Sequence, residues 1–257
     1  MTKNFTRNLN KLVITVLCVF IFVTNMVGQS LLTGSYHQLS VLAGRQSIND
    51  DHLDLSSANS NMKGLAWSYA NNNAHQRKSL TIVYEYGNTN NYKTAGYLIE
   101  YKNAFSISKY KNNGFTNYIG YSVKSDYQYI RYAEQYSWTA VNALSLYNSL
   151  NYSWEKNAFS FDVSIPVIGF VSRPDPEKQY EGAVNSMLYN SLSNPVFVSF
   201  HNYKEIDLSL RYMRYISNRF VFTTGISFSD QKILTENRFS KKEYQYQAGL
   251  SYFLKGR

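Results

Sequence analysis

The segment 243–254 alternates between two kinds of side chain almost to the end of the chain. Side chains of a β-strand point in turn to its two faces, so this pattern predicts a strand with one apolar face and one face of small, uncharged residues. The first face carries Tyr244, Tyr246, Ala248, Leu250, Tyr252 and Leu254, and the second carries Gln245, Gln247, Gly249 and Ser251. Such a strand is typical of a membrane barrel wall, with lipid outside and water or packed polar groups inside.

Nine earlier segments show the same period of two, and no long helix is indicated after residue 29 outside one loop. They span residues 36–45, 61–70, 78–87, 96–109, 115–132, 137–154, 158–170, 204–215 and 220–229. A tilted strand needs about ten residues to cross a bilayer. We therefore predict an all-β fold, a single antiparallel transmembrane β-barrel of about ten strands. Pro166, next to an expected outward Val167, removes a ladder donor and predicts a local bulge.

The long connection 171–203 leaves the number of strands open. It holds three of the four prolines, and Val184 has apolar neighbours four residues to either side, which predicts a short amphipathic helix. The segment 196–200 has strand character and shares the parity of Ile206. It either extends the strand 204–215 or forms an extra hairpin, which would give twelve strands. We expect ten.

The lengths of the connections predict how the barrel is oriented. Bacterial barrels have short periplasmic turns and longer outer loops. At one end we expect turns at residues 71–77, 111–114, 155–157 and 217–219, and at the other we expect outer loops at residues 46–60, 88–95, 133–136, 171–203 and 230–242. The loop 133–136 is the exception to the length rule. This pattern places both the N-terminus and the C-terminus in the periplasm.

Residues 1–28 have the pattern of a signal peptide, and residues 29–257 form the expected barrel domain. A basic start is followed by the apolar run 12–23, which is short for a helix that spans a bilayer, and by a small-residue site before Gln29. An uncleaved anchor is the alternative. Cys18, the single cysteine, lies within the apolar run behind Leu17, so lipidation is not expected and the mature chain has no thiol.

Composition excludes several classes of protein. A mean hydropathy of −0.38 with 16% aromatic residues is unlike a helical membrane protein and agrees with a barrel of alternating faces. The formal net charge is +9, yet no basic cluster forms. We interpret the pairs Arg77 with Lys78 and Lys241 with Lys242 as solvated charges at strand ends, so no nucleic-acid partner is expected.

Two further patterns favour a membrane barrel over a soluble one. The polar faces carry mostly Ser, Gly, Asn, Thr and Gln, whereas the outer face of a soluble barrel carries many Lys and Glu residues. Aromatic residues near strand ends predict the girdles found at membrane interfaces: Trp138, Tyr152, Trp154, Tyr212, Tyr244 and Tyr252.

With these features the chain resembles the small outer-membrane β-barrels of Gram-negative bacteria, specifically those of Bacteroidota type. The resemblance rests on class features and covers nearly all of the chain after residue 28. It implies an outer-membrane location, with outer-membrane lipid and the barrel-insertion machinery as partners. Many such proteins end on an aromatic residue that this machinery recognises, whereas Phe253 is followed by four more residues.

Charged residues on the inward faces are the first candidate site. They are Glu85, Glu100, Lys102, Lys124, Asp126, Asp162, Asp207 and Arg211. Because both signs are present, we expect ion pairs that fill a narrow lumen. A conducting path for small solutes is the alternative, and it would need the charges arranged as an unpaired lining.

The loops offer a weaker candidate. Asp50, Asp51, His52 and Asp54 in the first outer loop, with His201 beside the fourth, supply the residue types used by ten-stranded omptin-type proteases. No motif of that family is matched, and no Cys/His metal spacing, phosphate loop or nucleophile elbow occurs. We therefore expect no catalytic residue, metal or cofactor. The expected role is structural, or binding of an extracellular ligand or protein through the loop 171–203, with a channel second and a loop-borne hydrolase third.

Overall fold

The computed structural model describes residues 33–53, 55–73, 75–89, 92–107, 114–132, 135–174, 195–235 and 238–254. The signal peptide expected at 1–28 and the helix expected around Val184 lie outside these ranges. Within the described residues, no helix has the length and apolar character needed to span a bilayer.

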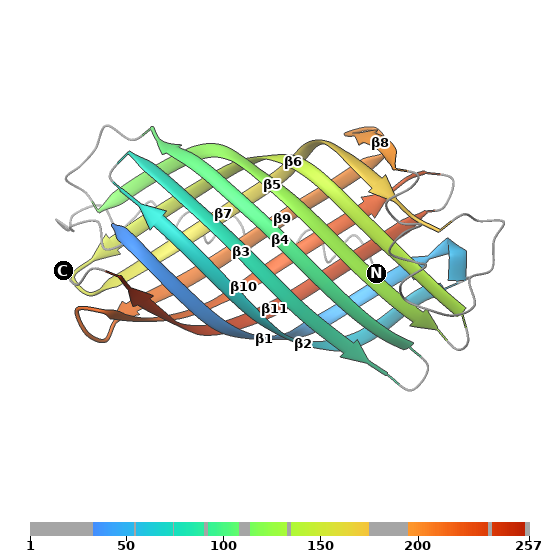
Figure 1. The fold of residues 1–257 in the computed structure, drawn as a ribbon, viewed down its shortest axis with the longest axis horizontal. Coiled ribbons are helices and arrows are strands. Elements are labelled where there is room, and N and C mark those ends of the chain that lie inside the picture. Colours follow the sequence, from blue (N-terminus) through green and yellow to red (C-terminus); the bar gives the residue numbers. More distant parts are fainter. Residues whose placement is uncertain are drawn as a thin grey trace, which may run out of the picture.

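Ten long strands form a closed antiparallel barrel, with an eleventh short strand attached to one edge (Figure 1). They are β1 (Gly34–Asp50), β2 (Leu55–Asn72), β3 (Gln76–Asn88), β4 (Tyr92–Ser106), β5 (Phe115–Tyr132), β6 (Gln135–Trp154), β7 (Asn157–Ser172), β8 (Val196–Ser199), β9 (Tyr203–Tyr215), β10 (Phe220–Ile233) and β11 (Phe239–Phe253). Each long strand pairs with its neighbour in sequence, β7 pairs with β9, and β1 with β11 closes the ring. The predicted fold and the count of ten are confirmed, and the twelve-strand alternative is wrong.

The two ends of the barrel differ. At the turn end, on the left of Figure 1, β1 begins, β11 ends and four turns join the strands. At the loop end, on the right, the short 3₁₀ helix η1 (Asp51–Leu53) follows β1, and the connection from β7 to β9 carries β8. The outer loops predicted at 46–60, 88–95 and 230–242 are largely strand instead. Their outward positions turn polar, as at Asn49 and Lys242, while the backbone ladder continues, so polarity alone gave a false boundary.

The bulge predicted at Pro166 is confirmed. The partner of β6 shifts from Ile168 opposite Leu144 to Pro166 opposite Ser145, which leaves Val167 as the extra residue. The alternation of β7 therefore changes phase, and Ile168 and Phe170 point outward in place of the expected Val167.

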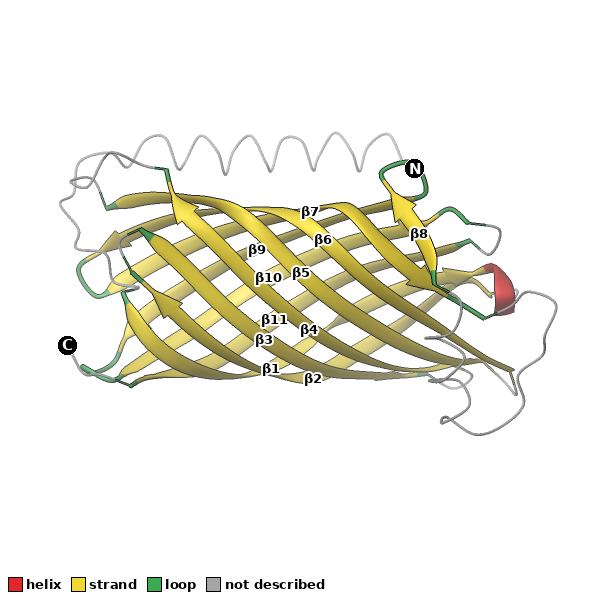
Figure 2. Cartoon of the chain, turned by 45° about the horizontal axis from the view of Figure 1, so that its top comes forward, coloured by secondary structure: helices red, strands yellow, loops and turns green. Residues whose placement is uncertain are grey.

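The short strand β8 takes an edge that β9 leaves vacant. β9 pairs with β7 up to Ser164 opposite Asp207, whereas Val196–Ser199 pairs with the segment of β7 beyond the bulge. Figure 2 shows β8 at the loop end of the wall. The expected continuous extension of the strand 204–215 is wrong, because a turn at residues 200–202 separates β8 from β9.

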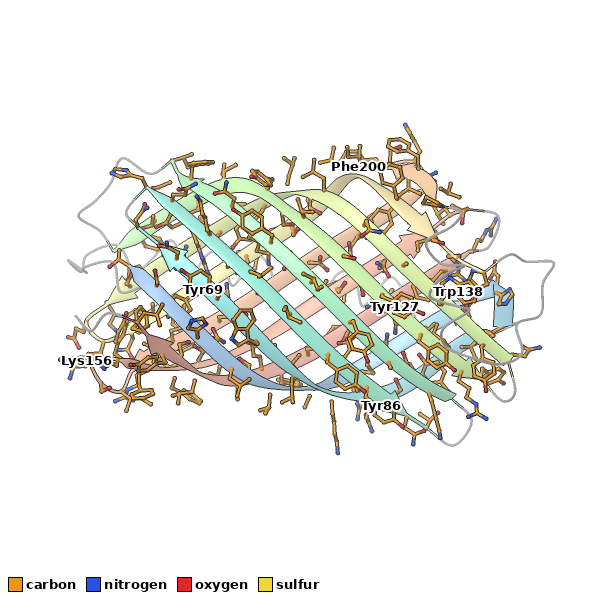
Figure 3. All side chains as sticks on the ribbon, in the orientation of Figure 1. Tyr69, Tyr86, Tyr127, Trp138, Lys156 and Phe200 are labelled. Atoms are coloured by element: carbon orange, nitrogen blue, oxygen red, sulfur yellow. The ribbon has the colours of Figure 1, made fainter. Side chains whose placement is uncertain are left out.

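The outside of the barrel carries an apolar band bounded by aromatic residues. Its exposed side chains include Leu39, Val41, Leu65, Ile82, Ile99, Val123, Leu146, Ile165, Ile226 and Leu250. At the turn end the rings of Phe115, Tyr152, Trp154, Phe159 and Tyr212 form a chain with successive centroids 4.6, 5.5, 5.4 and 5.2 Å apart. Figure 3 places Tyr69 toward the turn end and Tyr86 and Tyr127 toward the loop end.

One predicted girdle residue does not belong to this surface. Trp138 lies at the loop end of β6 and is 1% exposed, so its assignment to an outward girdle is wrong. Its parity is that of the outer face, but parity along one strand contains no information about what covers the strand. Tyr152 is also buried, in its case among the neighbouring rings of the turn-end chain.

Candidate functional site in the barrel lumen

The inward faces enclose a cavity of about 220 Å³ in the middle of the barrel. All eight charged residues predicted for the lumen line it, together with Lys241 and Glu243, from strands β3, β4, β5, β7, β9 and β11. The period of two is responsible, because one strand phase places every second side chain inside. How these charges are paired then decides whether they line an open pore or fill the lumen.

Asp162 is the centre of a network on the turn side of the cavity. It accepts hydrogen bonds from the hydroxyls of Ser149 at 2.5 Å and Ser160 at 3.0 Å, and it pairs with Arg211. The Arg77 Nη1 lies 3.9 Å from the same carboxylate and donates to Ser149 at 2.9 Å. One carboxylate thus links strands β3, β6, β7 and β9 across the lumen.

A second network joins β5 to β9. The Lys124 ammonium bonds to Glu205 and, at 3.2 Å, to Asp207. The Tyr203 hydroxyl donates to the other Glu205 oxygen at 2.5 Å and accepts a bond from Gln231 at 3.4 Å. Lys124 and Glu205 side chains are 6% and 1% exposed, so this is a buried ion pair with its remaining oxygen also bonded.

A third network lies on β11 and reaches two other walls. The Lys241 ammonium is 3.5 Å from both Asp126 and Glu243. The Gln245 amide donates to Glu85 at 2.7 Å and also to Glu243.

A smaller pair completes the wall at β4. The Lys102 ammonium lies 2.8 Å from Glu100 and 5.0 Å from the centroid of the Tyr147 ring. Each cationic residue of the cavity wall therefore has an anionic partner in the structure.

The sign of charge is unequal along the lumen. The loop-side networks contain five carboxylates and two ammonium groups, from Glu85, Asp126, Glu205, Asp207 and Glu243 with Lys124 and Lys241. The turn-side networks contain two carboxylates and three cations, from Glu100 and Asp162 with Arg77, Lys102 and Arg211. The loop-side half is therefore net acidic and the turn-side half net basic.

Apolar layers lie beyond the charges at both ends. At the loop end the layer contains Ile48, Leu53, Leu55, Tyr92, Ile130, Val141, Ala143, Val171, Val198, Tyr203, Ile233 and Phe239, from nearly every strand. At the turn end it contains Tyr36, Ala70, Ala158, Met213, Val221 and Phe253. Apolar residues thus lie on the inner wall at both ends, with the ion pairs between them.

An ion pair fixes the segment after β7 to the loop-end layer. Asp50, the last residue of β1, accepts bonds from Arg173 Nη2 at 2.5 Å and from the His52 backbone N–H at 3.0 Å. The Arg173 guanidinium also lies 4.9 Å from the Phe239 ring centroid. Burial lowers the pKa of Arg173 below its ordinary value, and the Asp50 carboxylate opposes that shift.

The described residues of the site expected in the outer loops lie on separate elements. Asp50 belongs to β1 and is fully buried in its pair with Arg173, whereas Asp51 and His52 form η1 and His201 is exposed in the turn before β9. Asp54 lies outside the described residues. Among the described side chains, no three His, Cys, Asp or Glu are placed to hold a metal ion.

Four charged residues of the networks were not among the candidates. The prediction that Arg77 and Lys241 are solvated is wrong, since they are 5% and 4% exposed. Glu205 and Glu243 were also missed. The signal was available in the parity, because Arg77 shares the inward phase of Glu85. Arg77 and Lys241 fall in predicted connections, whereas Glu205 and Glu243 lie within the first two positions of predicted strands.

Comparisons with known proteins support the fold. No protein-family model and no curated protein sequence matches the chain. Among solved structures, the outer membrane protease OmpT from Escherichia coli is similar, with a TM-score of 0.51 and 7% identity over 86% of this chain and 96% of that chain. The chain therefore has the fold of Gram-negative outer-membrane β-barrels.

Two other barrels are similar at lower scores. The β domain of the Bordetella autotransporter BrkA has a TM-score of 0.41 and 13% identity over 85% of this chain and 99% of that chain. The translocator domain of NalP from Neisseria meningitidis has a TM-score of 0.41 and 8% identity over 97% of each chain.

Proposed function

We propose that this protein is an integral outer-membrane barrel with a filled lumen, whose role is structural or surface-binding and not enzymatic. The observation that carries the proposal is the lumen itself, where ion pairs between facing walls lie between two apolar layers. An open pore needs charges that line water, whereas these charges bond to one another.

The apolar outer band supports the membrane location. An apolar outer surface of this extent indicates that lipid surrounds the barrel. Because the barrel is closed, its described wall has no unpaired strand edge except at β8. The short connections at the turn end support periplasmic N- and C-termini. Outer-membrane lipid and the barrel-insertion machinery are the partners this location requires.

The loop end supports a binding role through the connection 171–203. In its described part, Phe200 is 50% exposed, and Figure 3 shows it pointing away from the wall beside β8. Exposed aromatic residues are common anchors of protein interfaces. We propose an extracellular ligand or protein as the partner.

A narrow channel for small solutes is the second candidate. The cavity of about 220 Å³ and its unequal charge favour it. The apolar layers at both ends oppose it. The third candidate, a loop-borne hydrolase, is opposed by the ion pair that occupies Asp50.

Conductance across planar bilayers tests the first proposal against the second. We expect the purified protein to migrate faster on a denaturing gel before heating than after it, as a folded barrel does, and to give no single-channel steps. Steady conductance of the wild-type protein would establish the channel instead. A location in the soluble periplasm without a heat-dependent shift would refute the membrane barrel.

A further inference from the structure

The outer wall contains a groove of about 360 Å³ that no part of the proposed function uses. One register row crosses it from β4 to β8: Ile99 lies opposite Ser125, Ser125 opposite Asn142, Asn142 opposite Phe170, and Phe170 opposite Phe197. The middle of the row has short side chains and both ends have bulky ones. The difference in side-chain length makes the groove.

The walls of the groove are apolar. The next row toward the turn end supplies Tyr101, Val123, Leu144 and Ile168, and β8 supplies Phe197, whose ring centroid lies 5.7 Å from that of Phe170 in an edge-on contact. Its two polar floor residues, Ser125 and Asn142, lie directly opposite each other on β5 and β6. The groove therefore presents a hydrocarbon-like surface to whatever surrounds the barrel.

A ring of basic residues lies on the outside at the loop end, just beyond the apolar band. Its exposed, outward members come from seven strands and are Arg45, Lys63, Lys93, Arg131, Lys204, Lys232 and Lys242. Among the outward positions of the described strands, Asp230 is the one acidic side chain, and it lies 3.8 Å from Lys242. Such a ring complements negatively charged headgroups.

Two members of this ring lie on the strands that form the β4 and β5 side of the groove, nearer the loop end. Lys93 and Arg131 lie directly opposite each other on β4 and β5, and Arg131 is six residues from Ser125 along β5. Six residues of strand span about 20 Å. For a strand tilted by about 45°, this is a depth of about 14 Å, close to half of the roughly 30 Å hydrocarbon thickness of a bilayer.

We propose that the groove and the Lys93 and Arg131 pair together bind one membrane lipid with a negatively charged phosphate headgroup. The headgroup bonds to the two cations, and one acyl chain passes over the outward Tyr127 and Tyr129 and ends at the Ser125 side of the groove. This site rests on the proposal that the barrel spans a membrane, since the bilayer supplies the ligand.

Native mass spectrometry of the full chain tests the site, with dimyristoyl phosphatidylglycerol and dimyristoyl phosphatidylcholine as probes. We expect the wild-type protein to retain phosphatidylglycerol more strongly. Ser125→Phe should lower retention of both lipids about tenfold, the loss expected when about two buried methylene groups are displaced. Ala248→Phe is the matched control, because Ala248 is a small outward residue on β11, across the barrel. It should retain lipid as the wild-type protein does.

A second variant tests the contact between the lipid headgroup and the two cations. Lys93→Gln with Arg131→Gln should reduce phosphatidylglycerol retention to the phosphatidylcholine level and leave phosphatidylcholine unchanged. Equal retention by Ser125→Phe, Ala248→Phe and the wild-type protein overturns the groove, and an unchanged preference in the double variant overturns the headgroup contact. Heat-dependent migration of each variant shows that it is folded. If the wild-type protein lacks this shift, the membrane proposal fails, whereas a retained shift without lipid binding rejects the site alone.

Discussion

At the scale of the residue, the lumen depends on buried charges that have several partners each. Asp162 accepts bonds from three hydroxyls and is paired with two guanidinium groups, at 5% side-chain exposure. Removing one member of a buried ion pair leaves the other charge without compensation, which costs far more than the pair itself contributes. Loss of Asp162 should therefore destabilise the barrel strongly.

Asp162→Leu is expected to lower the free energy of unfolding by about 3–5 kcal/mol, because it leaves the buried Arg77 and the partly buried Arg211 without their carboxylate. Guanidinium unfolding of the barrel in lipid vesicles measures the change. Lys242→Gln is the control, because Lys242 is half-exposed in a surface pair, and its effect should stay within about 1 kcal/mol. Similar effects of both variants would contradict the role assigned to Asp162.

Arg173→Met is expected to destabilise the loop end, because it leaves the Asp50 carboxylate buried without a cation. The measurement is the thermal midpoint at which the fast-migrating, folded band is lost. Adding Asp50→Leu to Arg173→Met should recover part of the loss, since two apolar side chains can replace a buried pair. A double variant less stable than the single one would argue against this pair as the source of the effect.

At the scale of the element, sequence patterns were most informative in the middle of strands and least informative at their ends. The phase of β9 predicted Asp207 and Arg211 inside, and Pro166 predicted the bulge in β7. Strand ends were misjudged because polar outward residues look like loop while the ladder continues. The position of β8 was also unpredictable, since it depends on an edge of β7 that the bulge and β9 leave vacant.

β8 should stabilise the barrel through one side chain in particular. Val198 is fully buried in the loop-end apolar layer, whereas Phe200 in the following turn is half-exposed. Val198→Asp is expected to lower the free energy of unfolding by more than about 2 kcal/mol, because it buries an unpaired charge. Phe200→Ser should change it by less than about 0.5 kcal/mol. Denaturant unfolding in vesicles compares the two, and equal effects would mean that β8 is not part of the layer.

At the scale of the whole molecule, the sequence predicted the barrel fold but only part of the candidate site in the lumen. Alternation placed the eight expected charges on the cavity wall, but it could not show which charges would meet across the lumen. Those pairs, such as Lys124 with Glu205, depend on how far each strand is staggered around the ring. The burial of Trp138 was unpredictable for the same reason, because it depends on residues outside its own strand.

The pairing of β1 with β11 joins Tyr36 to Phe253, the two ends of the described barrel. Among the strand pairings of the wall, these contacts join residues that are furthest apart in the sequence. Their formation therefore costs the most chain entropy, and we expect them to form last. Until they form, the two outermost strands each expose an unsatisfied backbone edge that invites pairing with other chains. The barrel can therefore close only when both β1 and β11 are available. The pairing of these two strands is thus the step of folding at which misassembly is most easily introduced.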